Sequence, residues 1–147
     1  MNESHTGIRM RTMVTGKIHR ARVTGADVNY VGSVTIDSQL LDAADILPGE
    51  QVSVVNVTNG ERVVTYAIPG EAGKGEVVLN GAAAHQFSAG DIVIIMCYSQ
   101  IDDATARTFE PKIVFVDEHN RAVEYSTDPG QAPEGSGLGT SAVPIER

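Results

Sequence analysis

Short runs of alternating apolar and polar residues dominate this chain, and this alternation is typical of β-strands with one buried face. Residues 12–24 form the first such run. Within its segment "GKIHRARV", alternate positions are expected to face opposite sides of a sheet. One predicted face holds Lys17, His19, Ala21 and Val23, and the other holds Ile18, Arg20 and Arg22.

The segment "VSVVNVTNGERVVTYAI" predicts the clearest hairpin in the chain. Its turn is Asn59-Gly60, a pair that tolerates the positive φ angles of a type I′ turn. Beyond the turn, one predicted face carries Arg62, Val64 and Tyr66, and the opposite face carries Val63 and Thr65. Further strands are predicted over residues 76–79, 92–98 and 112–116.

The segment "TIDSQLLDAADILPGE" predicts a short helix. Asp37 or Ser38 can cap its N-terminus, and Pro48-Gly49 ends it. The apolar residues at helical spacing are Leu40, Leu41, Ala44 and Leu47. A second segment, "DDATART", predicts a turn of helix or a loop.

An internal echo links "ILPGEQVSVV" (46–55) with "FSAGDIVIIM" (87–96), because in each a glycine and an acidic residue precede a strand. Two β-halves of similar design suggest a small closed barrel with pseudo-twofold symmetry, and closure removes unpaired sheet edges. The sequence therefore predicts a mainly β fold with short helices.

The two ends of the chain differ from its middle. Residues 1–10 are expected to be a flexible extension, and Met10 offers a second possible start. Residues 126–147 are rich in Gly, Pro and Ser, so a disordered tail is expected, with Gly135-Ser136 as plain linker. The predicted folded domain covers residues 11–125.

Composition and charge exclude several classes of function. The 147-residue chain is 41% hydrophobic, enough for one domain with a core. Its net charge of −8 argues against nucleic-acid and anionic-membrane partners. It shows neither a signal peptide nor an apolar run near the ~20 residues that span a bilayer, so a cytoplasmic protein is expected. Cys97 is expected to be a buried, inert thiol.

The sequence shows no metal-binding pattern, because its four histidines lack ligand spacing and its one cysteine has no partner. Chemistry is suggested instead by Gly32-Ser33 within "NYVGSVTID". A serine hydroxyl can attack the preceding carbonyl in a strained turn, and elimination and hydrolysis then leave a pyruvoyl group. That ketone forms a Schiff base with an amine and withdraws electrons, as pyridoxal phosphate usually does. From these residues alone, an inert turn is the commoner interpretation.

Five separated blocks strongly resemble the family of aspartate 1-decarboxylase, a pyruvoyl-dependent lyase. They are "RTMVTGKIHRARVTGADVNYVGSVTID", "LLDAADIL", "NVTNGERVVTYAI", "NGAAAH" and "GDIVII", spanning residues 11–116 in order. The resemblance implies a closed six-stranded double-psi β-barrel. It also implies decarboxylation of L-aspartate to β-alanine and CO2 in pantothenate biosynthesis, by a cofactor made from the chain without metal or pyridoxal phosphate.

The same resemblance implies a role for each matching residue. Cleavage between Gly32 and Ser33 would convert an inactive precursor into chains 1–32 and 33–147, with the pyruvoyl group from Ser33. Tyr66 would be the proton donor, and Thr65 would assist processing and lie near substrate. The implied substrate contacts also include Arg62, Lys17, Asn80, Gly81, Ala82 and Ala83, and the implied supporting residues for processing are Tyr30 and His19.

Thr65 and Tyr66 would face opposite sides of a regular strand, so a shared pocket needs a distorted strand or a boundary between subunits. The resemblance implies a homotetramer with sites at such boundaries. Two alternatives stay open at this point: a barrel that only binds partners, and a pyruvoyl decarboxylase of another amino acid. The first is weakened by the joint presence of Gly32, Ser33, Thr65, Tyr66 and Arg62.

Overall fold

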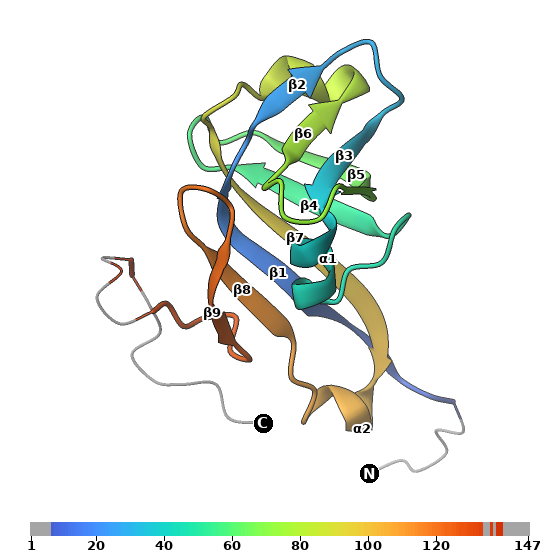
Figure 1. Ribbon diagram of the computed structural model, residues 1–147. Coiled ribbons are helices and arrows are strands. Elements are labelled where there is room, and N and C mark those ends of the chain that lie inside the picture. The colour runs from blue at the N-terminus through green and yellow to red at the C-terminus, as the bar shows by residue number, and fades with distance from the viewer. Residues whose placement is uncertain (1–6, 134–135, 137, 140–147) are drawn as a thin grey trace.

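The computed structural model describes residues 7–133, 136, 138 and 139, which form a mainly β protein with short helices (Figure 1). The helical elements are α1 (Ser38–Ala44), α2 (Asp103–Ala106) and the 3₁₀ helix η1 (Gly81–Gln86). The strands are β1 (Met10–Arg22), β2 (Gly25–Asp27), β3 (Ser33–Asp37), β4 (Gln51–Asn56), β5 (Arg62–Gly70), β6 (Val77–Asn80), β7 (Ile92–Asp102), β8 (Lys112–Val116) and β9 (Ala122–Ser126).

All described strands belong to one mixed sheet with the order β2-β6-β3-β5-β4-β7-β1-β8-β9. The prediction of a mainly β fold with short helices is confirmed. The sheet has nine strands and is open at β2 and β9, so it differs from the closed six-stranded barrel expected from the sequence. The open order arises because β2 and β9 each pair with a single neighbour in the described part of the chain.

Strand pairing is symmetric about the central antiparallel pair β4–β7. Moving outward on either side, the next pairs are antiparallel (β4–β5 and β7–β1), then parallel (β5–β3 and β1–β8), then antiparallel (β3–β6 and β8–β9). This repetition gives the two β-halves that the sequence echo predicts.

The echoed turns adopt the same local structure. Gly49 and Gly90 have φ angles of 86° and 95°, which favour glycine. The side chains of Glu50 and Asp91 each accept a hydrogen bond from the backbone N–H three residues earlier, both at 2.9 Å. The echo therefore marks equivalent positions in the two halves.

The predicted alternation of side chains between the two faces of β1 is observed only up to His19. The register with β7 shifts between Ile18 and Ala21, and Arg20 has a φ of 64°. This bulge brings Ala21 to the buried side with Ile18, and both are 0% exposed. The prediction that Ala21 and Val23 share a face with Lys17, and that Ile18 shares one with Arg20, is therefore wrong.

The predicted hairpin and first helix are confirmed. β4 and β5 pair in an unbroken register, which confirms the hairpin. The predicted two-residue type I′ turn is wrong. Asn56 N donates to Glu61 O, so the loop covers residues 57–60, and of Asn59 and Gly60 only Gly60 has a positive φ, at 82°. Asp37 caps α1 by accepting a hydrogen bond from Gln39 N at 2.8 Å. The helix ends earlier than expected, because Asp45 is left-handed, and Leu47 lies beyond it with 65% exposure. The segment "DDATART" contains the short helix α2, which agrees with the predicted turn of helix.

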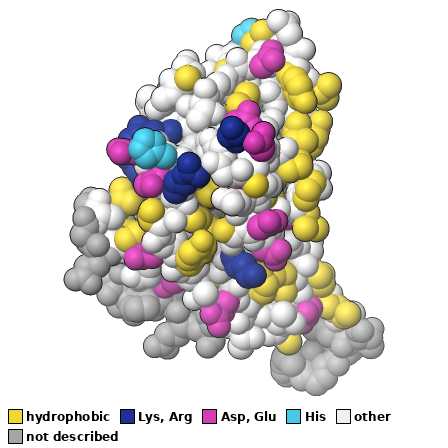
Figure 2. Space-filling view, in the orientation of Figure 1, with side chains coloured by type: hydrophobic (Ala, Val, Ile, Leu, Met, Phe, Trp, Pro, Cys, Tyr) yellow, Lys and Arg dark blue, Asp and Glu magenta, His cyan; other side chains and the backbone are white. Residues whose placement is uncertain are grey.

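The core is made mainly of Val, Ile, Leu and Ala side chains, with Cys97 among them at 0% exposure. The prediction of a buried cysteine is confirmed, and burial raises the pKa of the Cys97 thiol to about 11, which disfavours the reactive thiolate. None of the described helices is long and apolar enough to cross a membrane. Hydrophobic side chains also reach the surface, and Figure 2 shows them along the right-hand edge of the molecule.

The terminal predictions lie partly outside the described residues, as does Gly135. Within the described residues, strand pairing begins nearer the N-terminus and extends nearer the C-terminus than expected. Met10 already pairs with Asp102, and Ser126 pairs with Ile113. Ser126 Oγ also accepts a hydrogen bond from Asp128 N at 3.0 Å.

Candidate active site

The Ser33 hydroxyl is buried and fixed by two hydrogen bonds. Ser33 begins β3 directly opposite Asn80 in the antiparallel register with β6, and it is 0% exposed. Its Oγ donates to the Val31 carbonyl at 3.0 Å and accepts from Asn80 Nδ2 at 3.0 Å. The serine is thus held in one orientation at the junction between a surface loop and the sheet.

The loop before Ser33 leaves the Gly32 peptide open. Figure 1 shows the β2–β3 connection as an excursion at one end of the molecule. Tyr30 and Val31 are 53% and 71% exposed. A Cβ at Gly32 would meet nothing within 4 Å, so no side chain shields this side of the peptide. The Gly32 Cα is therefore open on the side where a side chain would stand.

The backbone of Gly81 packs against this loop. It begins η1 with a φ of 72°, and a Cβ there would lie 2.7 Å from Gly32 Cα and 3.2 Å from Tyr30 O. Only glycine fits both the backbone conformation and the contact. Ala82 and Ala83 follow in η1 and are exposed and half-buried, respectively. The sequence motif "NGAAAH" thus places small residues beside the Gly32 backbone.

A Gly81→Ala variant is expected to slow chain cleavage at least about tenfold, because the new methyl group must displace Gly32. The rate can be followed as the appearance of two bands on a denaturing gel. Gly60→Ala is the matched control, since Gly60 has a similar φ of 82° and open space at its Cβ position. Equal cleavage rates in the two variants would contradict this role of Gly81.

β5 presents Tyr66 on the same side of the sheet as Ser33. Val34 pairs with Ala67 in parallel register, so one step back places Ser33 beside Tyr66. Tyr66 is 39% exposed and shares its face with Arg62 and Val64, as predicted. Thr65 lies on the opposite face, and no hydrogen bond joins it to Gly32 among the described residues.

Arg62 begins β5 as an exposed cation without an ion pair to any residue in the described part of the chain. It lies about 13 Å along the strand from Tyr66, and a long side chain on the same face can span part of that distance. Its guanidinium is free to bind a carboxylate with two parallel hydrogen bonds.

Lys17 lies on this outer face of the sheet but far from Ser33. It shares a cross-strand row with Met96, Ser53 and Val64, so three strand spacings, about 14 Å, separate it from β5. Its Nζ donates to the Pro129 carbonyl at 3.4 Å, and burial lowers its pKa. A single chain therefore does not bring Lys17 to Ser33.

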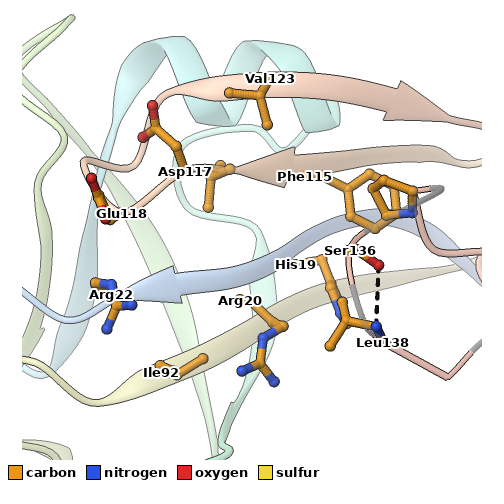
Figure 3. Close-up of a pocket in the computed structure, with 12 residues that line it drawn as sticks. His19, Arg20, Arg22, Ile92, Phe115, Asp117, Glu118, Val123, Ser136 and Leu138 are labelled. Carbon is orange, nitrogen blue, oxygen red and sulfur yellow. Dashed lines mark hydrogen bonds between the residues drawn. The ribbon is translucent and has the colours of Figure 1, made fainter.

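His19 lies in a different hollow, of about 360 Å³, between β1, β7 and β8 (Figure 3). Arg20, Asp117 and Glu118 also line it, and His19 alone among its lining residues belongs to the predicted site. The ring contacts Phe115 edge-on at 5.5 Å. Nδ1 is buried and has no hydrogen-bond partner among the described residues.

Burial lowers the pKa of His19 to about 4, with added repulsion from Lys17 and Arg20. Folding thus favours the neutral ring, and the unfolded chain binds more protons between pH 4 and 6.5. The His19 contribution to stability is complete above about pH 6.5 and is lost as the pH falls toward 4.

Urea unfolding of wild type and of a His19→Gln variant checks this expectation. The stability difference between them is expected to change between pH 7 and pH 4, with wild type losing more as the pH falls. His119→Gln is the control, because that histidine is exposed. A pH-independent difference would contradict a depressed pKa at His19.

Thr35 is a site residue that the sequence predictions missed. Asn80 Nδ2 donates to Thr35 Oγ1 at 3.0 Å, at the same distance as to Ser33 Oγ. The sequence feature that could have identified Thr35 is its spacing of two residues from Ser33, which puts both side chains on one face of β3. No group of three or more His, Cys, Asp or Glu side chains is placed to hold a metal within the residues that the structure covers.

These residues define a small mainly β protein with a buried serine hydroxyl after an exposed glycine, an exposed tyrosine on the neighbouring strand, and an arginine without an ion pair further along that strand among the described residues. Comparison with protein families is more specific. The family model described as aspartate decarboxylase matches residues 9–123. The chain therefore belongs to the aspartate decarboxylase family, whose name indicates a lyase acting on aspartate.

Proposed function

We propose that this chain converts L-aspartate to β-alanine and CO2 with a pyruvoyl group made from its own Ser33, and so supplies pantothenate synthesis. The observation that carries the proposal is the Ser33 hydroxyl, buried and held by Asn80 next to the open Gly32 peptide. Family membership supports aspartate as the substrate.

Self-processing begins with the Ser33 hydroxyl. Its Oγ forms a bond to the Gly32 carbonyl carbon, the Gly32–Ser33 amide bond breaks, and the hydroxyl proton passes to the released nitrogen. Loss of the Ser33 α-proton then expels Gly32 as a carboxylate and leaves dehydroalanine. Water converts the tautomeric imine of that residue to a ketone and releases ammonia. The Val31 carbonyl accepts the hydroxyl proton in the resting precursor, so attack requires that hydrogen bond to break.

The residues around Ser33 fit a pyruvoyl group. Asn80 Nδ2 donates to the hydroxyl oxygen at 3.0 Å, and a carbonyl oxygen is also an acceptor. The pyruvoyl group supplies an electrophilic ketone that binds an amine and withdraws electrons from it.

Charge and position assign roles to the remaining side chains. Arg62 binds one substrate carboxylate, because it is an exposed cation with no competing ion pair in the described chain. Since about 13 Å of strand separate it from Tyr66, Arg62 of a second copy can fill this role as well as Arg62 of the same chain. Tyr66 holds the proton that replaces the departing CO2, since it flanks Ser33 on the same face. The backbone N–H groups of residues 81–83 bind the substrate anion, and Thr65 and Tyr30 assist processing.

We also infer that sites form between copies of the chain in a homotetramer. Lys17 and Ser33 lie on the same outer face but are separated by several strands, so a Lys17 contact to substrate requires a second copy. That face exposes Val64 at 60% and Tyr98 at 43%, which favours its burial against another protein surface. The repeated strand pairing in the two halves of the sheet supports the pseudo-twofold symmetry of a double-psi barrel, while the described sheet itself is open at β2 and β9.

The test is to incubate purified full-length protein with L-aspartate, without added pyridoxal phosphate, and to measure β-alanine and CO2. Pretreatment with a carbonyl reagent such as phenylhydrazine is expected to abolish activity, because it blocks a ketone. L-Glutamate is the specificity control and is expected to react far more slowly. Insensitivity to phenylhydrazine would contradict the pyruvoyl mechanism, and preference for glutamate would contradict the substrate. Absence of turnover with every amino acid would favour a binding module.

A further inference from the structure

We propose that Thr35 is a positioning residue for self-cleavage, because its hydroxyl fixes the Asn80 amide that holds the Ser33 nucleophile. This inference rests on the proposed function. It assigns Thr35 no contact with substrate or with the Gly32 carbonyl. Its effect passes through Asn80.

The three side chains form one hydrogen-bonded unit across β3 and β6. Ser33 and Thr35 are two residues apart and lie on the same face of β3, while Val34 and Ile36 between and beyond them are 0% exposed in the core. Asn80 stands opposite Ser33 on β6. Its Nδ2 donates to Ser33 Oγ and to Thr35 Oγ1, each at 3.0 Å.

The amide NH2 has two hydrogens, so the two acceptors use both of them. Asn80 is 2% exposed, and water therefore has little access to compete for these bonds. A half-turn of the amide would place its oxygen, which cannot donate, against Ser33 Oγ. Ser33 already donates its one hydrogen to Val31, so its oxygen needs a donor and the NH2 group faces it. Thr35 Oγ1 accepts the second N–H and holds the amide in that plane.

This orientation holds Ser33 in its resting state before attack. The hydroxyl oxygen has one hydrogen and two lone pairs. The hydrogen is directed at the Val31 carbonyl, and one lone pair accepts from Asn80. The bond to Val31 must break before attack, whereas the Asn80 donor can stay in place and keep the oxygen beside the Gly32 peptide. Without a fixed Asn80 donor, the hydroxyl can rotate away from that arrangement, and fewer molecules are poised to react.

A Thr35→Val variant tests the inference because valine keeps the shape of threonine and removes the acceptor. The full-length precursor is purified promptly, and its cleavage into two bands is followed on a denaturing gel. Cleavage is expected to be about tenfold slower in Thr35→Val and within about twofold of wild type in Thr35→Ser, which restores the hydroxyl.

Thr24→Val is the matched control. Thr24 Oγ1 also bonds to β6, donating to Val77 O at 3.1 Å and accepting from Val77 N at 3.0 Å, but it does not contact Asn80. This variant is expected to lose stability and to cleave at a rate near that of wild type. Urea unfolding of both variants separates a change in folding from a change in cleavage.

If Thr35→Val is destabilised, a double-mutant cycle with Asn80→Ala shows whether its effect on cleavage passes through Asn80. Thr35→Val is expected to slow cleavage in the wild-type background and to have no further effect when Asn80 is already alanine. Equal slowing in both backgrounds, or wild-type cleavage by a folded Thr35→Val protein, would overturn the role of Thr35. A wild-type chain that never cleaves would instead overturn the proposed function on which this inference rests.

Discussion

A Ser33→Ala variant is expected to remain one uncut chain and to lose aspartate decarboxylation by at least about a thousandfold. The methyl group of alanine cannot attack the Gly32 carbonyl, so neither cleavage nor formation of the ketone can follow. The protein should still fold, because Ser33 contributes only its hydroxyl to the hydrogen bonds with Val31 and Asn80. A denaturing gel and an assay of CO2 release measure the two effects.

Ser88→Ala is the control for this variant, since Ser88 is exposed in the turn before β7. It is expected to cleave and to decarboxylate aspartate at wild-type rates. Full activity of an uncut Ser33→Ala protein would show that Ser33 is not the source of the catalytic group.

The second large effect is expected for Tyr66→Phe, which should cleave normally and turn over aspartate roughly 100- to 1,000-fold more slowly. Phenylalanine keeps the ring on the face shared with Ser33 and removes only the phenolic proton. Because the proton is required after CO2 has left, the loss should fall on kcat more than on KM. Steady-state kinetics of the cleaved variant measures this division.

Tyr98→Phe is matched to this change, because Tyr98 is also a strand tyrosine with 43% exposure. It is expected to retain wild-type turnover. If Tyr66→Phe fails to cleave, the phenol acts in processing, and if it turns over normally, another group donates the proton.

Features that depend on neighbouring residues in the sequence could be predicted from the sequence. The β4–β5 hairpin, the Asp37 cap and the two echoed glycine turns all follow from local backbone preferences. The two-residue type I′ turn expected at Asn59-Gly60 does not form, because the loop covers residues 57–60. The alternation of Arg62, Val64 and Tyr66 on one face also follows, because β5 has no bulge in its register with β4.

Features set by contacts between distant residues were missed. The bulge at Arg20 reverses the predicted faces of β1, and alternation alone cannot reveal an inserted residue. No strand was predicted where β9 lies, at the end of the domain. Its segment "AVEYS" has few buried positions, and it forms a strand by pairing with β8.

The predicted site residues also fall into a group that lies together and a group that does not. Ser33, Asn80 and Gly81 were predicted together and lie together, since β3 and β6 pair directly. Lys17 and His19 were predicted with them, but the strand order places β1 well away from β3. A motif match names residues that act in one reaction, and it does not state whether one chain or two supply them.

The intact mass of each chain in the purified active protein tests whether Ser33 becomes a pyruvoyl group. We expect a short chain that ends at Gly32 with a free carboxylate. We also expect a long chain that begins at residue 33 and is lighter by one ammonia than the same chain with an N-terminal serine. An active preparation that contains only the uncut chain, or whose long chain begins with unmodified Ser33, would show that the catalytic group has another origin.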